Sequence, residues 1–251
     1  MDIESNWNRI KTHRGKLSNQ DIWGLSTVLF FEQEEWLERK LKYKEDEAMA
    51  VEFLSCLGQH GSRKAAAVLL RQLENREEMM QVAATEGLKH CPMEYTLEPL
   101  TRMMLRQNQS AIKAGEVMLS YGAPGADVLW ELWFSQDNLS GLKAQILRLL
   151  TEAEDQRAER LAFLAFLSEE EELLREALIT AEKLGAVGLW GNVAGCLTHP
   201  SWRFRGRAVK LLGQWGIAEA LVYLLAMGED PDPWVEEERQ KAIAVLETVN
   251  E

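Results

Sequence analysis

The segment HPSWRFRGRAVKLLGQWG, residues 199–216, indicates the fold most clearly. Pro200 makes a turn, and a helix is expected to begin near Ser201. Small and apolar residues then recur at spacings of three and four residues as far as Leu212. Two glycines follow, Gly213 and Gly216, and glycine commonly ends a helix. The segment therefore predicts one amphipathic helix between two turns.

Leu212 also belongs to a ladder of leucines with a constant period. The members of the ladder, here called rungs, are Leu57, Leu88, Leu119, Leu150 and Leu212. Successive rungs are the same number of residues apart, except that the last interval is twice as long. Leu184 comes three residues late for the missing rung, and Ile243 again lies one step beyond Leu212, which predicts a small insertion followed by a matching contraction. A constant period of this length is typical of repeat architectures.

Each period predicts a pair of helices. An amphipathic segment leads up to each rung, and a Gly or Pro break follows it, as in residues 57–61 and 120–125. A second apolar-periodic segment comes next, as in residues 66–73. Strand patterns are nearly absent and strong helix formers dominate. We therefore predict an all-α fold, a right-handed α-α superhelix (solenoid) of about seven antiparallel helix pairs.

The ends of such an array are expected to differ from its middle, because a terminal repeat lacks a neighbour on one side. We predict N-terminal capping helices in residues 1–45, repeats in residues 46–233 and a C-terminal capping helix in residues 234–251. The three parts are expected to form one structural domain.

The charge balance disfavours polyanions as partners. The chain has 28 Lys and Arg against 40 Asp and Glu, a formal net charge of −12, so its field repels nucleic acid and anionic membranes. Its three cysteines are far apart and imply no disulfide framework. The opening residues lack the pattern of a secretion signal, and no segment is apolar enough to span a membrane. These features predict a cytoplasmic protein without nucleic-acid or membrane partners.

The segment at 199–216, with a looser copy NREEMMQVAATEGLKHCP at 75–92, resembles the opening of a HEAT repeat. The resemblance covers residues 46–250 and is to HEAT-like, PBS-lyase-type α-solenoids, which are related to armadillo arrays. It implies a non-enzymatic scaffold or adaptor that binds a protein or peptide along the concave face, which the second helix of each pair usually lines. A basic or amphipathic-helical partner would complement the acidic chain.

Two alternatives come from the same resemblance. One is a DNA-repair glycosylase of the DNA-alkylation-repair type, which would need a basic concave face and places aromatic and acidic residues near the lesion. The other is a chaperone similar to bilin lyases, which handles bilins or their carrier proteins. The net charge has the wrong sign for the first, and visible absorbance would reveal the second.

No catalytic motif is found in the sequence, and we assign no catalytic residue and expect no cofactor. A Gly-rich phosphate loop, a Gly-x-Ser-x-Gly elbow, a His-Glu-x-x-His pair and a Cys-x-x-Cys pair are all missing. Some HEAT-like proteins are metal-dependent hydroxylases built on repeated His-Glu dipeptides. None of the four histidines here is followed by Glu, which argues against that activity: His13, His60, His90 and His199.

One set of residues has a spacing that could hold a metal. His60 and Cys91 are one period apart, in equivalent turns of neighbouring repeats, and His90 is beside Cys91. Imidazole and thiolate would suit zinc. A fourth ligand is missing, because the next equivalent turn has only Tyr121 and Gly122. We therefore expect a partly buried cysteine with turn histidines, and no metal.

Candidate partner-binding residues are aromatic or basic. Trp130 and Phe134, four residues apart, are expected to share the solvent-facing side of a second helix. The acid-free segment 202–210 predicts a contact for an anion or an acidic peptide, with Arg205 instead paired to an acid of a neighbouring repeat. For each Trp, packing between repeats is the alternative role. The full candidate set is Trp130, Phe134, Trp190, Trp202, Arg203 and Arg207.

Overall fold

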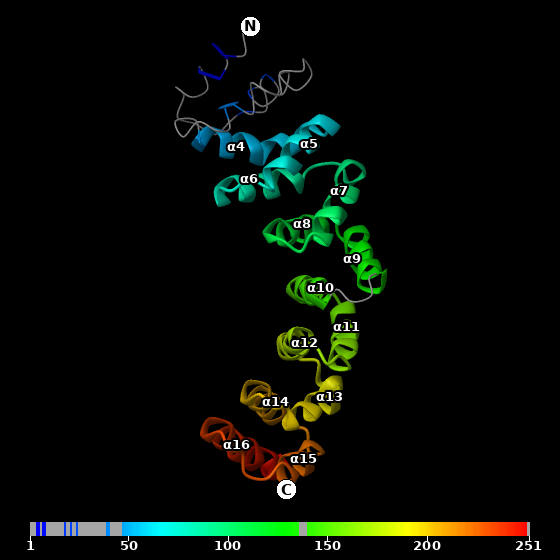
Figure 1. The fold of residues 1–251 in the computed structure, drawn as a ribbon, viewed down its shortest axis with the longest axis vertical. Coiled ribbons are helices and arrows are strands. Elements are labelled where there is room, and N and C mark those ends of the chain that lie inside the picture. The colour runs from blue at the N-terminus through cyan, green and yellow to red at the C-terminus, as the bar shows by residue number, and fades with distance from the viewer. Residues whose placement is uncertain are drawn as a thin grey trace. The chain divides into compact units, whose positions relative to one another are not determined.

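The computed structural model describes residues 47–135 and 140–249, together with residues 4, 5, 7, 8, 18, 21, 24, 39 and 40. Within this part of the chain every regular element is a helix (Figure 1). The chain divides into two compact units, Met1–Ser135 and Gln136–Glu251, which are described one at a time as the N-terminal and the C-terminal unit. Most of the capping segment expected in residues 1–45 lies outside the described residues, so the division into caps and repeats stays a prediction.

Residues 47–135 of the N-terminal unit form three successive helix pairs. Successive first helices pack against each other, α4 on α6 and α6 on α8. The helices and the short 3-10 turn η2 have these bounds: α4 Glu47–Leu57, η2 Gly58–His60, α5 Arg63–Gln72, α6 Glu78–Leu88, α7 Met93–Leu105, α8 Gln109–Ser120 and α9 Ala123–Ser135.

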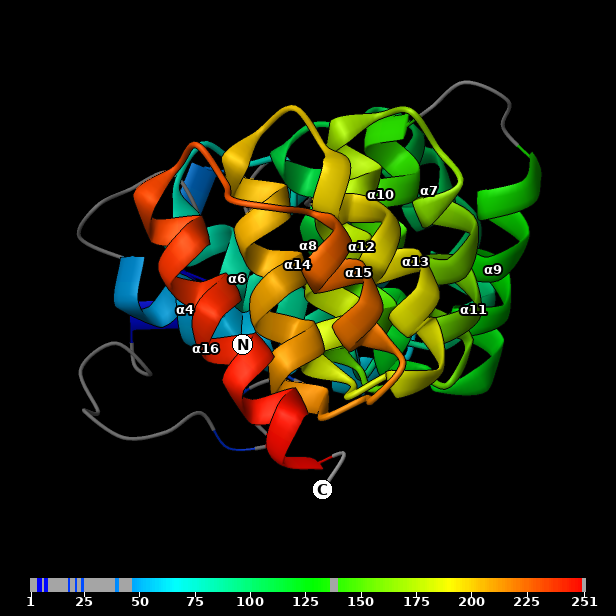
Figure 2. The same ribbon diagram turned by 90° about the horizontal axis from the view of Figure 1, so that it is seen from below.

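The C-terminal unit continues the same pattern with three pairs and a last long helix. Its elements have these bounds: α10 Ser140–Glu152, α11 Arg157–Phe166, α12 Glu171–Lys183, η3 Val187–Leu189, α13 Trp190–Gly195, η4 Cys196–Thr198, α14 Trp202–Trp215, α15 Ala220–Ala226 and α16 Pro233–Val249. The first helices α12, α14 and α16 form one row, and the second helices α11, α13 and α15 form the other (Figures 1 and 2). The predicted all-α helical-repeat fold is confirmed.

The period of the repeat has no interruption. The first helices begin at residues 47, 78, 109, 140, 171, 202 and 233, and the step between successive starts is always the same. The predicted insertion near Leu184 is therefore wrong. Ala181, which lies one period after Leu150, is fully buried at the rung position, whereas Leu184 follows the end of α12 and is only half-buried. A pattern of leucines alone does not include this rung, because alanine fills it.

Most rungs are core residues. Leu57, Leu88, Leu150 and Leu212 are fully buried, while Leu119 is half-buried and its neighbour Met118 takes the buried position. Each rung lies at or near the end of a first helix, so the ladder marks where successive pairs stack.

The predicted turns adopt the backbone conformation that glycine favours. Gly61 and Gly216 have φ of 69° and 64°, the left-handed region in which a side chain would be strained. Gly216 directly follows α14, and Gly61 separates η2 from α5. After that turn, Ser62 caps α5, because its hydroxyl accepts a hydrogen bond of 3.2 Å from the N–H of Ala65.

Both rows of the C-terminal unit bend towards the first helices, which therefore form its concave side (Figure 1). The expectation that second helices line the concave face is wrong for this unit. Small residues explain the close spacing on the first-helix side: a Cβ added at Gly213 of α14 would lie 2.7 Å from the Cβ of Ala242 on α16.

No helix among the described residues is long and apolar enough to cross a membrane.

Candidate functional site

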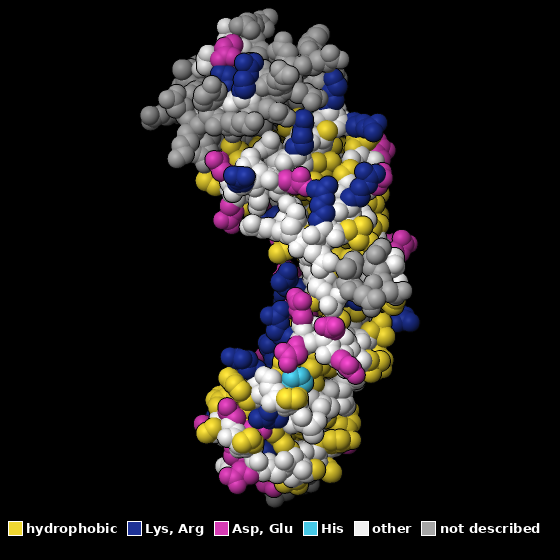
Figure 3. Space-filling view, in the orientation of Figure 1, with side chains coloured by type: hydrophobic (Ala, Val, Ile, Leu, Met, Phe, Trp, Pro, Cys, Tyr) yellow, Lys and Arg dark blue, Asp and Glu magenta, His cyan; other side chains and the backbone are white. Residues whose placement is uncertain are grey.

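A groove between α12 and α14 is the candidate site. These neighbouring first helices enclose a cavity of about 160 Å³, lined by Arg175 and Leu178 from α12 and by Arg203, Phe204 and Arg207 from α14. Leu178 and Phe204 are buried, so the lower part of the cavity is apolar, while the three arginines form a basic rim. Lys and Arg side chains gather along the flank of the unit over α10, α12 and α14 (Figure 3).

The three arginines of the rim differ in their partners. Arg207 forms an ion pair of 2.6 Å with Glu182, and Arg175 lies 3.2 Å from a carboxylate oxygen of Glu176. Arg203 places its guanidinium carbon 5.1 Å from the ring centre of Trp202, a cation–π contact. Within residues 47–135 and 140–249, no carboxylate forms an ion pair with Arg203. Arg203 therefore has the greatest capacity to bind an added anion.

Glu176 is a buried acid beside the groove. Glu176 is only 4% exposed. Burial raises the pKa of its carboxyl, and the nearby positive charges of Arg175 and Arg148 oppose that rise. The side chain of Arg175 is 55% exposed, so much of it stays accessible to solvent beside this carboxylate.

Two exposed tryptophans lie next to the groove. The rings of Trp202 and Trp234 meet edge to face with centroids 5.8 Å apart, and the two residues are 41% and 44% exposed. Trp234, at the start of α16, covers Gly206, where an added Cβ would overlap the indole. Trp202 and Arg203, both predicted from the sequence, therefore lie in one continuous surface with Arg207.

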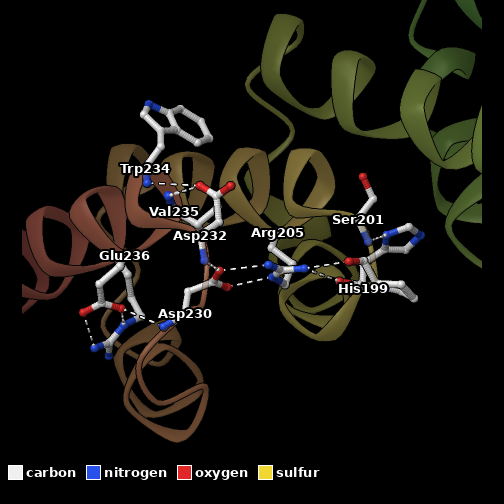
Figure 4. Close-up of polar contacts among 10 residues, drawn as sticks. His199, Ser201, Arg205, Asp230, Asp232, Trp234, Val235 and Glu236 are labelled. Atoms are coloured by element: carbon white, nitrogen blue, oxygen red, sulfur yellow. Dashed lines mark hydrogen bonds and ion pairs between the residues drawn. The ribbon is translucent and has the colours of Figure 1, made fainter.

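Arg205 has a structural role. Its guanidinium donates two hydrogen bonds to Asp230, of 2.7 and 2.8 Å, and two more to the carbonyl oxygens of His199 and Pro200 (Figure 4). Asp230 belongs to the loop before α16, so the predicted pairing with an acid of a neighbouring repeat is confirmed. Asp232 in the same loop caps α16 by accepting hydrogen bonds from the N–H groups of Trp234 and Val235.

The paired carboxylates of this loop and of α16 predict that the protein loses stability in acid. Hydrogen bonds from Arg205 hold the pKa of Asp230 below its ordinary 3.8, and those from Arg239 and the N–H of Asp230 lower the pKa of Glu236 from 4.5 to about 2. Because the pKa of each carboxyl is lower in the folded than in the unfolded protein, the two groups stabilise the fold fully above about pH 4.5. Their contribution is lost as the pH falls towards 2. We expect urea midpoints to fall over this range, and to fall less steeply in a Glu236→Gln variant. Equal slopes in both proteins would contradict the expectation.

The remaining aromatic candidates lie elsewhere. Trp190 on α13 is half-buried and meets Tyr223 of α15 edge to face, at 5.8 Å between centroids, in the row of second helices. Trp130 and Phe134 belong to α9 of the N-terminal unit, where their rings are 5.0 Å apart and Phe134 is 53% exposed. The half-burial of Trp130 and Trp190 fits packing at least as well as recognition.

The residues of the suggested metal position differ in their exposure: Cys91 is buried, His60 is half-buried and His90 is exposed. Cys91 is 4% exposed, and burial raises the pKa of its thiol to about 11, which disfavours the thiolate that binds a metal. Burial also lowers the pKa of His60. The described residues contain no group of three or more His, Cys, Asp or Glu side chains placed to hold a metal ion.

The sequence did not indicate Arg175, Leu178, Phe204 or Trp234 as site residues. A signal was nevertheless available in the period: Arg175 precedes Gly206 by one period, and Arg203 precedes Trp234 by one period. Only a comparison of equivalent positions across repeats would have revealed that two arginines stand where the next pair has a glycine and a tryptophan.

No protein-family model matches the chain, and no curated protein matches its sequence. Among solved structures it is similar to an archaeal HEAT-like repeats protein from Thermococcus onnurineus NA1, with 13% identity over 88% of this chain and 98% of that one, and a TM-score of 0.48. It is also similar to human deoxyhypusine hydroxylase in complex with glycerol, with 17% identity over 98% and 97% of the two chains and a TM-score of 0.39. A designed armadillo repeat protein shares 16% identity over 84% and 98%, with a TM-score of 0.32. These likenesses concern the fold and say nothing about activity.

Proposed function

We propose that this chain is a non-enzymatic scaffold or adaptor that binds a protein or peptide on the concave, first-helix side of its repeats. The observation that carries this proposal is the groove between α12 and α14, which combines an apolar lower part with a basic rim, and whose Arg203 stacks on the exposed Trp202. Aromatic residues and arginine are the side chains that contribute most to binding energy in protein interfaces. The groove offers such contacts without a nucleophile or an acid–base pair.

Affinity purification from the cells of origin tests this proposal. We expect the wild-type chain to recover a protein partner at near-physiological salt, and a Trp202→Ala/Arg203→Ala variant to lose that partner. Lys210→Ala is the matched control, because Lys210 is exposed on the same helix and does not line the cavity. Recovery of no partner, or equal recovery by all three proteins, would remove the support. Circular dichroism of each variant verifies that the fold is retained.

The two alternatives make different predictions. A DNA-repair glycosylase would bind damaged duplex DNA at low salt, and a bilin-handling chaperone would give a purified protein that absorbs visible light. The net charge of −12 repels a phosphate backbone, and the single groove with its three arginines covers too short a stretch to reverse that repulsion along a duplex. We therefore expect no binding of duplex DNA, and the absorbance of the purified protein tests the second alternative.

A further inference from the structure

We infer that the groove between α12 and α14 binds an acidic segment of a protein partner, with one apolar side chain of that segment inserted between the arginines. This inference rests on the proposed function and specifies its partner. The net charge of the whole chain suggested a basic partner, but the local charge of the groove has the opposite sign. We therefore expect the positive charge of the groove to determine which partner binds there.

The equivalent groove one repeat later shows what is special about this one. Between α14 and α16, Trp234 lies directly over Gly206, so the position is filled from within the chain. Between α12 and α14, the same two positions hold Arg203 and Arg175, which line one cavity. Two like charges replace a packed aromatic ring, and the space between them stays open to solvent. An anionic ligand would relieve that juxtaposition.

The chemistry of the rim favours a carboxylate. A guanidinium offers parallel N–H donors that match the two oxygens of a carboxylate. Arg203 stacks on Trp202, which orients its guanidinium without using its charge on an acid, and the side chain of Arg175 is 55% exposed beside Glu176. Arg203 and Arg175 are thus the expected contacts for the acidic residues of the segment, with Arg207 held in place by Glu182.

The apolar lower part of the cavity argues for a peptide over a phosphate polymer. Leu178 is 1% and Phe204 9% exposed, and together they form an apolar surface beneath the arginines. A closed cavity of about 150 Å³ lined by apolar side chains alone can hold benzene, and the groove between α12 and α14 offers a space of similar volume, about 160 Å³. A leucine or phenylalanine side chain would fill this space, whereas a phosphodiester backbone would leave it empty and would meet the repulsive field of the acidic chain.

Fluorescence anisotropy with a synthetic probe tests the inference. The probe is a fluorescein-labelled peptide of about twelve Asp and Glu residues with one central Phe. We expect the full-length chain to bind it, and an Arg175→Glu/Arg203→Glu variant to bind at least about tenfold more weakly, since one charge-assisted contact corresponds to about that factor. Lys210→Glu, a charge reversal outside the cavity, is expected to retain most of the affinity. Arg203→Gln serves if the double variant does not fold.

Three matched probes define the result. Replacing Phe by Ser is expected to weaken binding several-fold, replacing the acids by Lys to abolish it, and a duplex DNA of equal charge to bind no better than the Ser probe. Equal affinity of wild type and the Arg variants, or equal binding of the Phe and Ser probes, would overturn the inference. If the probe fails while Trp202→Ala/Arg203→Ala still loses a cellular partner, the partner chemistry is wrong and the proposed function stands.

Discussion

Replacing Asp230 with alanine is expected to lower the free energy of unfolding by about 3–5 kcal/mol, because it leaves a buried guanidinium without its counter-charge. The side chain of Asp230 is 1% exposed and that of Arg205 is 12% exposed, so water cannot easily replace the lost carboxylate. The substitution also removes the acceptor for the N–H of Asp232, which is part of the loop that starts α16. Urea denaturation followed by circular dichroism measures the effect.

A second ion pair on α14 provides the control. Arg207 and Glu182 are 37% and 33% exposed, so Glu182→Ala should cost at most about 1 kcal/mol. Replacing both buried partners with apolar residues, as in Arg205→Met/Asp230→Leu, should recover much of the loss, because no buried charge then remains unpaired. A cost for Asp230→Ala no larger than that for Glu182→Ala would show that the pair is not buried in solution.

Replacing Gly87 with alanine, near the C-terminal end of α6, is expected to destabilise the N-terminal unit by about 1–3 kcal/mol. Helix propensity alone predicts the opposite sign, since alanine is better than glycine in a helix by about 1 kcal/mol. Packing overrides propensity here, because an added Cβ would overlap the backbone oxygen of Leu54 on α4 and would lie 2.9 Å from a methyl group of Leu69. A carbonyl of a neighbouring helix cannot move aside as a flexible side chain can.

Gly191→Ala is the matched variant. Gly191 lies in α13 with no atom within 4 Å of its added Cβ, so only helix propensity acts and stability should be unchanged or increased by up to about 1 kcal/mol. Thermal unfolding of both variants gives the comparison. If Gly87→Ala raised the melting temperature as Gly191→Ala does, α4 and α6 would be farther apart than the structure shows.

The helical class, the turns and the period of the repeat could all be predicted from the sequence, because they depend on local information. Amphipathic spacing defines each helix, and glycines such as Gly61 and Gly216 end them wherever the repeat occurs. The pairing of Arg205 with an acid was predicted correctly too. The late rung at Leu184 was not, because Ala181 fills the rung position and small residues are easily overlooked in a pattern based on leucine.

The groove itself depended on the tertiary structure. Trp202, Arg203 and Arg207 lie on one helix, and their proximity follows from helical spacing alone. Arg175 and Leu178 join them from α12 because of how closely two first helices pack. The separation of neighbouring first helices depends on side chains far apart in the sequence, as where Gly206 of α14 lies beneath Trp234 of α16. Helix identity is therefore a property of short segments, whereas the open space between α12 and α14 exists only after the repeats have stacked.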